Sequence, residues 1–248
     1  MATTQIDAEV AAILGQATAD GCNLQLPPEQ LERGLYVKVN KVIEALGGTW
    51  DRKLKAHVFV DPVADLLAEA LGQGRVVDLK QQWQFFETPR AVAERLCDLA
   101  DLTPGETVLE PSAGRGALAD VLSERGALVL CVELNPRNAQ CLRDKGYEVS
   151  EEDFLTMPAT ADYATIIANP PFTKQQDIDH VNHMLDCLGT PGVCVSVMSA
   201  GTRFRENAKA TAFRGRIVSF GGEFFDLPDG AFKDSGTNAN ACVVRVVT

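Results

Sequence analysis

The pattern of apolar and polar positions along the chain changes near residue 80. In the first part, Ile6, Val10, Ile13 and Leu14 recur at helical spacing, and glycines or prolines follow the amphipathic stretches. The pattern predicts helices over about residues 5–18, 30–46 and 62–71, and a short hairpin over residues 50–60. We therefore expect residues 1–80 to form a small, mainly helical extension that carries one hairpin.

From Thr88 onward, short apolar runs alternate with amphipathic stretches. Strands are expected at residues 107–109, 128–132, 164–168 and 193–197, and helices at residues 88–99, 117–124 and 135–145. In the first of these helices, Thr88 is expected to be the cap and Pro89 to lie in the first turn. Such alternation is typical of a parallel sheet covered by helices on both faces. Residues 81–248 are therefore predicted to form an α/β domain with a doubly wound, mostly parallel sheet.

The end of the chain has a different pattern. Residues 216–225 and 239–247 are typical of two strands, joined by a loop that contains Asp229-Gly230 and Gly236. Consecutive strands with no helix between them usually pair antiparallel. We expect them to form an antiparallel hairpin at one edge of the sheet.

Composition narrows the functional classes. No stretch of the 248-residue chain approaches the roughly 18 to 20 consecutive apolar residues that span a membrane. The first residues lack a basic start and an apolar run, so we predict no secretory signal and a cytoplasmic protein. The seven cysteines form no C-x-x-C pair and are expected to be reduced. His180 and His183 lie one helical turn apart, but no third ligand accompanies them, and we predict no metal site.

The formal net charge of −11 means that the surface is not coated with phosphate-binding cations. The cations gather in two clusters, one within residues 33–55 and one within residues 203–216. Each cluster is either a nucleic-acid contact or an ordinary solvated face. An enzyme of this charge that acts on nucleic acid would depend on such clusters.

A glycine-containing loop follows the first strand of the predicted sheet. Gly114, Gly116 and Ala119 match the spacing G-x-G-x-x-A, and Glu133 ends the next strand about 20 residues later. Small residues let the backbone approach a ligand closely, and an acidic residue at that later position can hold ribose hydroxyls. The spacing alone fits a dinucleotide site as well as a plain tight turn.

Four residues, Glu110-Pro111-Ser112-Ala113, stand between this strand and the first glycine. With them, the segment resembles the glycine loop of class I S-adenosylmethionine-dependent methyltransferases, particularly the DNA amino-methyltransferases. The resemblance covers about residues 85–248, and it implies a Rossmann-like seven-stranded sheet and S-adenosylmethionine as the cofactor. The cofactor contacts that it implies are Phe86, Thr88, Glu110, Ser112, Gly114, Gly116, Glu133, Asp153, Phe154 and Asn169.

The resemblance also implies roles for these residues. The segment with Phe86 and Thr88 would wrap the methionine part of the cofactor, and Glu133 would hold its ribose. Asp153 would accept the adenine amino group, and Phe154 would pack on the adenine ring. Turn capping is the alternative for Asp153, and core packing is the alternative for Phe154.

The most specific motif is Asn169-Pro170-Pro171-Phe172, at the end of an apolar strand. An exocyclic amine on an aromatic ring is a poor nucleophile because its lone pair is delocalised. The Asn169 side-chain oxygen and the next backbone carbonyl can accept both amine hydrogens, and the prolines hold these carbonyls in place. Phe172 offers a face for the planar ring. No strong general base is required, so Asn169, Pro170 and Phe172 are the predicted catalytic residues.

Asn followed by Pro-Pro-Phe resembles the motif of adenine N6 methyltransferases, and the whole pattern resembles small phage-type DNA adenine methyltransferases. We therefore predict transfer to a flipped adenine in DNA, with DNA favoured over RNA as the partner. Adenine N6 in RNA and the side-chain amide of a protein glutamine are the alternatives. The pattern leaves the recognition sequence and the oligomeric state open.

Nucleic-acid contacts are expected from two regions. Arg203-Phe204-Arg205 follows a strand, where it can grip a phosphate and stack on a base. The last loop, with Phe232 and Lys233, resembles a loop that helps to hold an extruded base. Solvated loops are the alternative for both segments. The other predicted contacts are Lys174, Arg52, Lys53 and Lys55.

Overall fold

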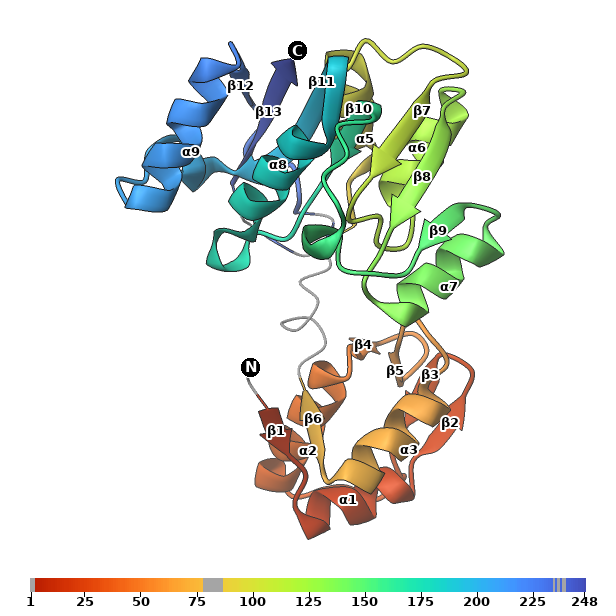
Figure 1. Ribbon diagram of the computed structural model, residues 1–248. Helices are drawn as coiled ribbons and strands as arrows, with labels where there is room; N and C mark the ends of the chain where they lie inside the picture. The colour runs from red at the N-terminus through yellow and green to blue at the C-terminus, as the bar shows by residue number, and fades with distance from the viewer. Residues whose placement is uncertain (1–2, 78–86, 234, 236, 238–239) are drawn as a thin grey trace. The chain divides into compact units, whose positions relative to one another are not determined.

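The computed structural model describes residues 3–77, 87–233, 235, 237 and 240–248, and Figure 1 draws it as a ribbon. The chain divides into two compact units, residues 1–84 and residues 85–248. Within the described ranges, no helix is long and apolar enough to cross a membrane.

The described part of the first unit combines three helices with short strands. The helices are α1 (Ala8–Gly15), α2 (Arg33–Ala45) and α3 (Val63–Gln73). A four-stranded antiparallel sheet has the order β2 (Thr18–Asp20), β3 (Asn23–Gln25), β5 (Ala56–Val58) and β4 (Thr49–Asp51). A separate antiparallel pair joins β1 (Thr3–Gln5) to β6 (Arg75–Val77). The apolar faces of the three helices meet in one core cluster that includes Leu14, Ile43 and Leu67.

Local signals explain why the helices and one hairpin of this unit were predictable. Asp7 caps α1, because its Oδ1 accepts a hydrogen bond of 2.9 Å from the Val10 N–H. Gly74 ends α3 in the left-handed conformation, with φ of 64°. The described strands of this unit are all three residues long, which is too short for apolar alternation to reveal them reliably, and of these strands only the β4–β5 hairpin was predicted.

The second unit contains a seven-stranded sheet with the order β12-β13-β11-β10-β7-β8-β9. Five strands are parallel: β7 (Thr107–Glu110), β8 (Leu128–Val132), β9 (Glu148–Ser150), β10 (Tyr163–Ala168) and β11 (Leu188–Ser199). β13 (Ala241–Val247) is antiparallel to β11 and to β12 (Glu223–Asp226). The predicted α/β class, with a mostly parallel sheet and an antiparallel hairpin at its edge, is confirmed.

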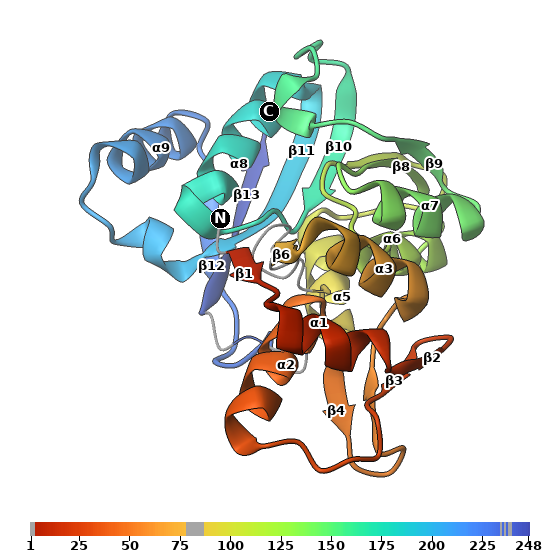
Figure 2. The ribbon, with the colours of Figure 1, turned by 90° about the horizontal axis from the view of Figure 1, so that it is seen from below.

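Helices cover both faces of this sheet, as Figures 1 and 2 show. Alternate strand residues point to opposite faces: Val108 and Ile167 pack in one core cluster, whereas Leu109 and Ile166 pack in the other. The first cluster includes α5 (Arg90–Leu99), α6 (Ala117–Glu124) and α7 (Pro136–Asp144). The second cluster includes α8 (Gln176–Cys187) and α9 (Ala208–Ser219). The described residues of this unit also form the short 3-10 turns η1 (Phe154–Thr156), η2 (Thr173–Gln175) and η3 (Ala200–Arg203).

The strand predicted over residues 216–225 is wrong in its first half. Helix α9 continues to Ser219, because Phe213 and Ile217 lie one helical turn apart and both are buried in the core. Gly221, with φ of 66°, follows the helix in the left-handed conformation. The strand β12 begins only at Glu223.

Candidate active site

The carboxyl ends of neighbouring parallel strands bring the predicted site residues to one edge of the sheet. β7 ends at Glu110 and continues into the glycine loop, β8 ends just before Glu133, and β10 ends just before Asn169. β7 pairs with β8 on one side and with β10 on the other. Ligands of open α/β sheets bind in the crevice outside such strand ends. The edge beside β7 is therefore the candidate site.

Two glycines in the loop after β7 have backbone conformations that other residues rarely adopt. φ is 57° at Gly114 and 87° at Gly116, and both angles are left-handed. A Cβ atom at Gly116 would lie 3.0 Å from Leu142 Cδ2 and 3.3 Å from Lys145 Nζ. Lys145 also donates a hydrogen bond of 2.7 Å to the Arg115 carbonyl. The loop is thus a tight backbone cradle, the form in which peptide groups can approach a ligand.

Glu133 holds this loop through its carboxylate. Oε2 accepts a hydrogen bond of 2.7 Å from the Gly114 N–H, and Oε1 accepts one of 2.7 Å from the Asn135 N–H. Burial raises the pKa of Glu133, and the hydrogen bonds from Asn135 and Gly114 oppose that shift. A carboxylate has about four acceptor positions, so Glu133 can also accept ribose hydroxyls. Its role in cofactor binding stays a prediction.

Glu110 is buried at the start of the loop with one oxygen unsatisfied. The residue is 2% exposed, and Oε2 has no hydrogen-bond partner among the described residues. Burial raises the pKa of Glu110 well above its ordinary value, and the nearby Glu133 carboxylate adds to this shift. A cationic amino group beside Oε2 would relieve the cost of burying this oxygen. The loop therefore fits a cofactor with an amino group, such as the methionine end of S-adenosylmethionine.

The remaining predicted cofactor residues have different positions. The Ser112 hydroxyl donates to the Pro111 carbonyl, and Phe86 lies outside the described residues. Asp153 caps η1 by accepting a hydrogen bond of 3.0 Å from the Leu155 N–H. This is the turn-capping alternative for Asp153, whose contact with a cofactor stays a prediction.

The surroundings of Phe154 match the core-packing alternative, and its stacking on the cofactor stays a prediction. Phe154 is 3% exposed and lies in the core beneath α8. Its ring contacts the rings of His183 and His180, with centroid separations of 4.8 Å and 5.9 Å. The sequence alternative, core packing, is the observed one.

Asn169 is fixed by a residue that is distant in the sequence. Its Nδ2 donates a hydrogen bond of 3.1 Å to Thr88 Oγ1, and Thr88 is 8% exposed. With the NH2 group directed at Thr88, the amide is oriented so that Oδ1 faces away from it. Pro170 is buried and Phe172 is half-buried against the core cluster of α5 and α6.

This contact corrects the role of Thr88. The cap of α5 is Pro89, which makes no side-chain cap hydrogen bond, and the helix begins at Arg90. Thr88 therefore lies before the cap, where its hydroxyl reaches Asn169 instead of the first turn of the helix. Its proximity to Asn169 links the segment before α5 with the Asn-Pro-Pro-Phe motif.

The loop after the motif contains two consecutive non-glycine residues in the left-handed conformation. φ is 52° at Lys174 and 60° at Gln175, directly before α8. Each such residue costs about 1–2 kcal/mol of backbone strain. Strain of this kind persists only where neighbouring contacts hold it, and it concentrates at functional sites.

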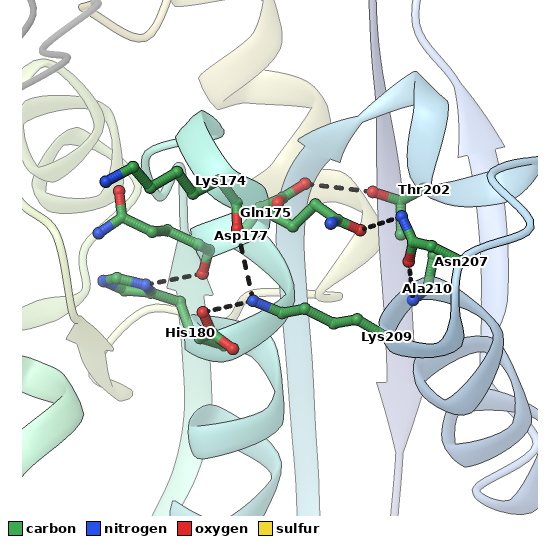
Figure 3. A network of polar contacts seen from close by, with 10 residues as sticks. Lys174, Gln175, Asp177, His180, Thr202, Asn207, Lys209 and Ala210 are labelled. Atoms are coloured by element: carbon green, nitrogen blue, oxygen red, sulfur yellow. Dashed lines mark hydrogen bonds and ion pairs between the residues drawn. The ribbon is translucent and has the colours of Figure 1, made fainter.

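Helix α9 supplies the contacts that hold this loop, as Figure 3 shows. Asn207 caps α9 through Oδ1, and its Nδ2 donates a hydrogen bond of 3.2 Å to Gln175 Oε1. Lys209 Nζ lies 2.6 Å from Asp179 Oδ2 and 3.5 Å from the Lys174 carbonyl oxygen. We call Asn207 and Lys209 the α9 clamp. No role was predicted for Asn207, although an asparagine just before a helix is a recognisable cap signal.

Asp177 links α8 to the segment that follows β11. It is fully buried, and its Oδ2 accepts a hydrogen bond of 2.9 Å from the Ser199 N–H. The same oxygen accepts one of 3.2 Å from the Thr202 hydroxyl (Figure 3). Burial raises the pKa of Asp177, and the hydrogen bonds from the Ser199 N–H and the Thr202 hydroxyl oppose this shift. The sequence analysis missed this residue, because only the fold shows that it is buried. Asp177 fixes η3 and thereby the start of the predicted nucleic-acid segment.

The cations predicted to contact nucleic acid near the motif differ in whether they form ion pairs within the protein. Arg203 forms an ion pair with Asp226, so part of its charge is already neutralised. Lys174, Arg205 and Lys233 are exposed, and none forms an ion pair with another described residue. They follow β10, β11 and β12, and these strands run in the same direction. Their backbones therefore lie along the same edge of the sheet as Asn169.

The two aromatic residues predicted to contact bases differ in burial. Phe204 is 72% exposed and can offer a ring face to a base. Phe232 is 3% exposed and belongs to the core cluster of α5 and α6. The buried position of Phe232 does not favour contact with a base, and that role stays a prediction.

The contacts of His180 and the state of the cysteines bear on the predicted absence of a metal site. His180 lies 2.9 Å through Nδ1 from the Gln176 carbonyl (Figure 3), and burial lowers the pKa of His180. All seven cysteines are free thiols. Across the part of the chain that the structure describes, no group of three or more His, Cys, Asp or Glu residues could hold a metal ion.

Parts of the chain are similar to ribosomal RNA methyltransferases, whereas no family model matches it. The rRNA adenine N-6-methyltransferase of Streptomyces fradiae is 32% identical over 102 residues, which are 38% of this chain and 32% of that protein. The ribosomal RNA small subunit methyltransferase A of Thermotoga maritima is 31% identical over 98 residues, 38% of this chain and 35% of that protein. The matched part thus spans about a third of each relative's length.

Solved structures with the same architecture are also methyltransferases. The methyltransferase subunit of a type I restriction-modification system from Streptococcus thermophilus has a TM-score of 0.56 at 18% identity. The match covers 75% of this chain and 50% of that one. At this identity the likeness concerns the fold alone. Together with the strand order, it gives the second unit the class I, Rossmann-like methyltransferase fold.

The relatives correct the predicted acceptor. Both relatives are named for ribosomal RNA, and the Streptomyces protein is named for adenine N6. The prediction that DNA is the substrate and the favoured partner is therefore wrong. Adenine in RNA, which the sequence analysis kept as an alternative, is the acceptor that these relatives favour.

Proposed function

We propose that this chain, whose second unit has the class I methyltransferase fold, transfers the methyl group of S-adenosylmethionine to N6 of an adenine in RNA. The observation that carries the proposal is the placement of Asn169. It follows the strand next to the glycine loop, and its NH2 group is engaged by Thr88. The names of the relatives support ribosomal RNA as the class of acceptor.

Residues of the glycine loop would hold the cofactor. Glu133 would accept its ribose hydroxyls, and Glu110 would accept hydrogen bonds from its amino group through the oxygen that lacks a partner. The left-handed Gly114 and Gly116 let the backbone pass close to the bound molecule. When bound, S-adenosylmethionine supplies a methyl group on a positively charged sulfur, which is already reactive toward a nucleophile.

Asn169 and Pro170 would prepare the acceptor amine. Because the Asn169 NH2 group is directed at Thr88, its Oδ1 is the atom that accepts one amine hydrogen, and the Pro170 carbonyl accepts the other. These bonds draw the nitrogen toward a tetrahedral geometry and free its lone pair. Held by Asn169 Oδ1 and the Pro170 carbonyl, the amine would present its freed lone pair to the methyl group that S-adenosylmethionine would supply, and water would take the proton that the nitrogen gives up. Positioning therefore supplies most of the rate, and no strong base is needed.

The cations at the same sheet edge suit a nucleic-acid acceptor. Lys174, Arg205 and Lys233 are exposed and form no ion pair with a described residue, so their charge can reach phosphates. Phe204 is exposed between two arginines and can stack on a base beside the target adenine. These four residues are the proposed RNA contacts of the second unit.

The experiment is a transfer assay with labelled S-adenosylmethionine. Unmethylated ribosomal RNA, transfer RNA, DNA and a glutamine-containing release-factor domain are offered in parallel, and digested RNA is analysed for N6-methylated adenosine. We expect label in RNA as methylated adenosine, and an initial rate of labelling lower by about 10² or more with Asn169→Ala. Label found only in the protein or only in DNA would refute the proposal.

A further inference from the structure

A second candidate RNA-binding surface lies in the first unit, at the turn between β4 and β5. Three of the four turn residues are cations: Arg52, Lys53 and Lys55. The turn is ordered, because Asp51 Oδ1 accepts hydrogen bonds from the Lys53 N–H at 2.7 Å and the Leu54 N–H at 2.9 Å. All four turn side chains are exposed. An ordered backbone therefore presents three positive charges to solvent.

These charges have no carboxylate partners in the described structure. Arg52, Lys53 and Lys55 form no ion pair with any described residue. Asp51, the acidic residue next to them in the chain, accepts backbone N–H groups instead. Elsewhere cations are often paired, as Lys38 is with Asp7 at 3.0 Å. In a chain with net charge −11, three unpaired cations within four residues form a concentrated positive site.

An aromatic ring lies beside these cations on a rigid base. Trp50 is 48% exposed and stands directly across the hairpin from His57, with ring centroids 5.0 Å apart. His57 is 1% exposed, and its Nε2 lies 3.1 Å from Asn40 Oδ1 of α2. The indole ring thus packs on a buried, hydrogen-bonded imidazole. Leu54, at 55% exposure, adds an apolar side chain to the same hairpin.

We propose that this hairpin surface, made of Trp50, Arg52, Lys53, Leu54 and Lys55, binds single-stranded RNA and docks the substrate of the methyltransferase unit. The cations would contact phosphates, and Trp50 would stack on an unpaired base. A duplex hides its base faces, so the exposed ring favours a single strand over a helix. The inference rests on the proposed function for the claim that the bound RNA is the substrate.

The expected magnitudes follow from the number of contacts. Each phosphate contact to a single strand contributes about −0.7 to the slope of log affinity against log salt, so three contribute about −2. The ratio of the RNA affinity of the wild type to that of a variant without these cations should then fall about 20-fold between ~50 and ~200 mM salt. Loss of one stacked base weakens binding roughly tenfold, with little change in that slope.

The test uses the full chain and a fluorescent single-stranded RNA. Anisotropy titrations over a salt series compare the wild type with Trp50→Ala and with the combined Arg52→Ala, Lys53→Ala and Lys55→Ala variant. A charge-matched control removes three paired cations, Lys38→Ala, Arg125→Ala and Arg143→Ala. If circular dichroism shows that the alanine variant is unfolded, glutamine replaces alanine at the same positions.

We expect the hairpin variants to raise the KM for RNA at least fivefold, with unchanged kcat and S-adenosylmethionine affinity. Equal RNA affinity and salt slope in the hairpin triple variant and its control would overturn the inference. Anionic vesicles and an acidic peptide are offered as competing probes. The inference would also be overturned if the hairpin triple variant lost affinity only for one of these probes and kept its affinity for RNA. If the wild type methylates RNA and the hairpin variants are normal, only this inference fails. If the hairpin binds RNA but no RNA is methylated, the proposed function fails instead.

Discussion

Replacing Asn207 by serine separates two contacts that its side chain makes at the start of α9. Oδ1 caps the helix, and Nδ2 donates to Gln175 in the strained loop after the Asn-Pro-Pro-Phe motif. Serine is about as good a helix cap as asparagine, but it has no amide NH2 group to reach Gln175. Asn207→Ser should therefore weaken the loop contact and keep the cap, whereas Asn207→Ala loses both.

The magnitude follows from the strain and the contacts that oppose it. Lys174 and Gln175 together cost about 2–4 kcal/mol in their left-handed conformations. The Asn207–Gln175 hydrogen bond is exposed, which places its contribution near 1 kcal/mol or below. Loss of this hydrogen bond can change the equilibrium constant between the left-handed conformation of the loop and its alternatives by at most about fivefold. We expect kcat to fall about two- to fivefold in Asn207→Ser, with an unchanged Kd for S-adenosylmethionine.

Glycine at position 175 provides the rescue. It adopts positive φ without the penalty of a side chain, so Gln175→Gly should recover about 1 kcal/mol of strain. In the Asn207→Ser background, the Gln175 side chain has already lost its Asn207 partner, and the double variant should regain wild-type kcat within about twofold.

The assay combines steady-state methyl transfer to RNA with calorimetric titration of the cofactor and thermal unfolding. Asn207→Ala should lower Tm more than Asn207→Ser, because it also removes the cap. The clamp hypothesis is refuted if Asn207→Ser has wild-type kcat. It is equally refuted if adding Gln175→Gly lowers kcat further, since the left-handed backbone would then not be what the clamp holds.

Three further predictions concern the residues at the strand ends. Asn169→Ala should lower kcat by about 10² or more in single-turnover methyl transfer while cofactor affinity stays near normal, and an unaltered rate would exclude its assigned role. Thr88→Val should lower kcat about five- to tenfold, the scale of one hydrogen bond, and Thr88→Ser should restore it; a changed cofactor Kd at constant kcat would contradict positioning of Asn169. The pKa of Glu110 is raised in the folded protein, so the folded state keeps its proton to a higher pH than the unfolded state does. The contribution of Glu110 to the free energy of unfolding is therefore fully present below its ordinary pKa, and it is lost as the pH rises through the raised pKa of the folded state. Glu110→Gln should therefore flatten the fall of Tm with rising pH in the absence of cofactor, and parallel Tm profiles for both proteins would count against the buried, proton-binding carboxyl.

The sequence was sufficient for those features that local periodicity encodes. Ile166 and Ile167 alternate between the two faces of the sheet, and a period of two residues is readable without a structure. The apolar runs also placed two features at strand ends: the loop with Gly114 and Gly116, and the motif at Asn169. Because the carboxyl ends of neighbouring parallel strands meet at one edge of the sheet, both features lie at that edge. These signals arise within a few residues of chain, so the sequence alone predicted the fold class and the strand ends at which the glycine loop and the motif lie.

The tertiary structure decided which partner each polar or aromatic side chain meets. Thr88 reaches Asn169 across 81 positions, and Asn207 reaches Gln175 across 32 positions, distances that no local pattern encodes. Phe232 is buried although its polar loop suggested exposure. Burial and pairing depend on what the fold brings from elsewhere in the chain. The sequence therefore determined where chemistry could gather, and only the packed structure determined which side chains are held, covered or neutralised there.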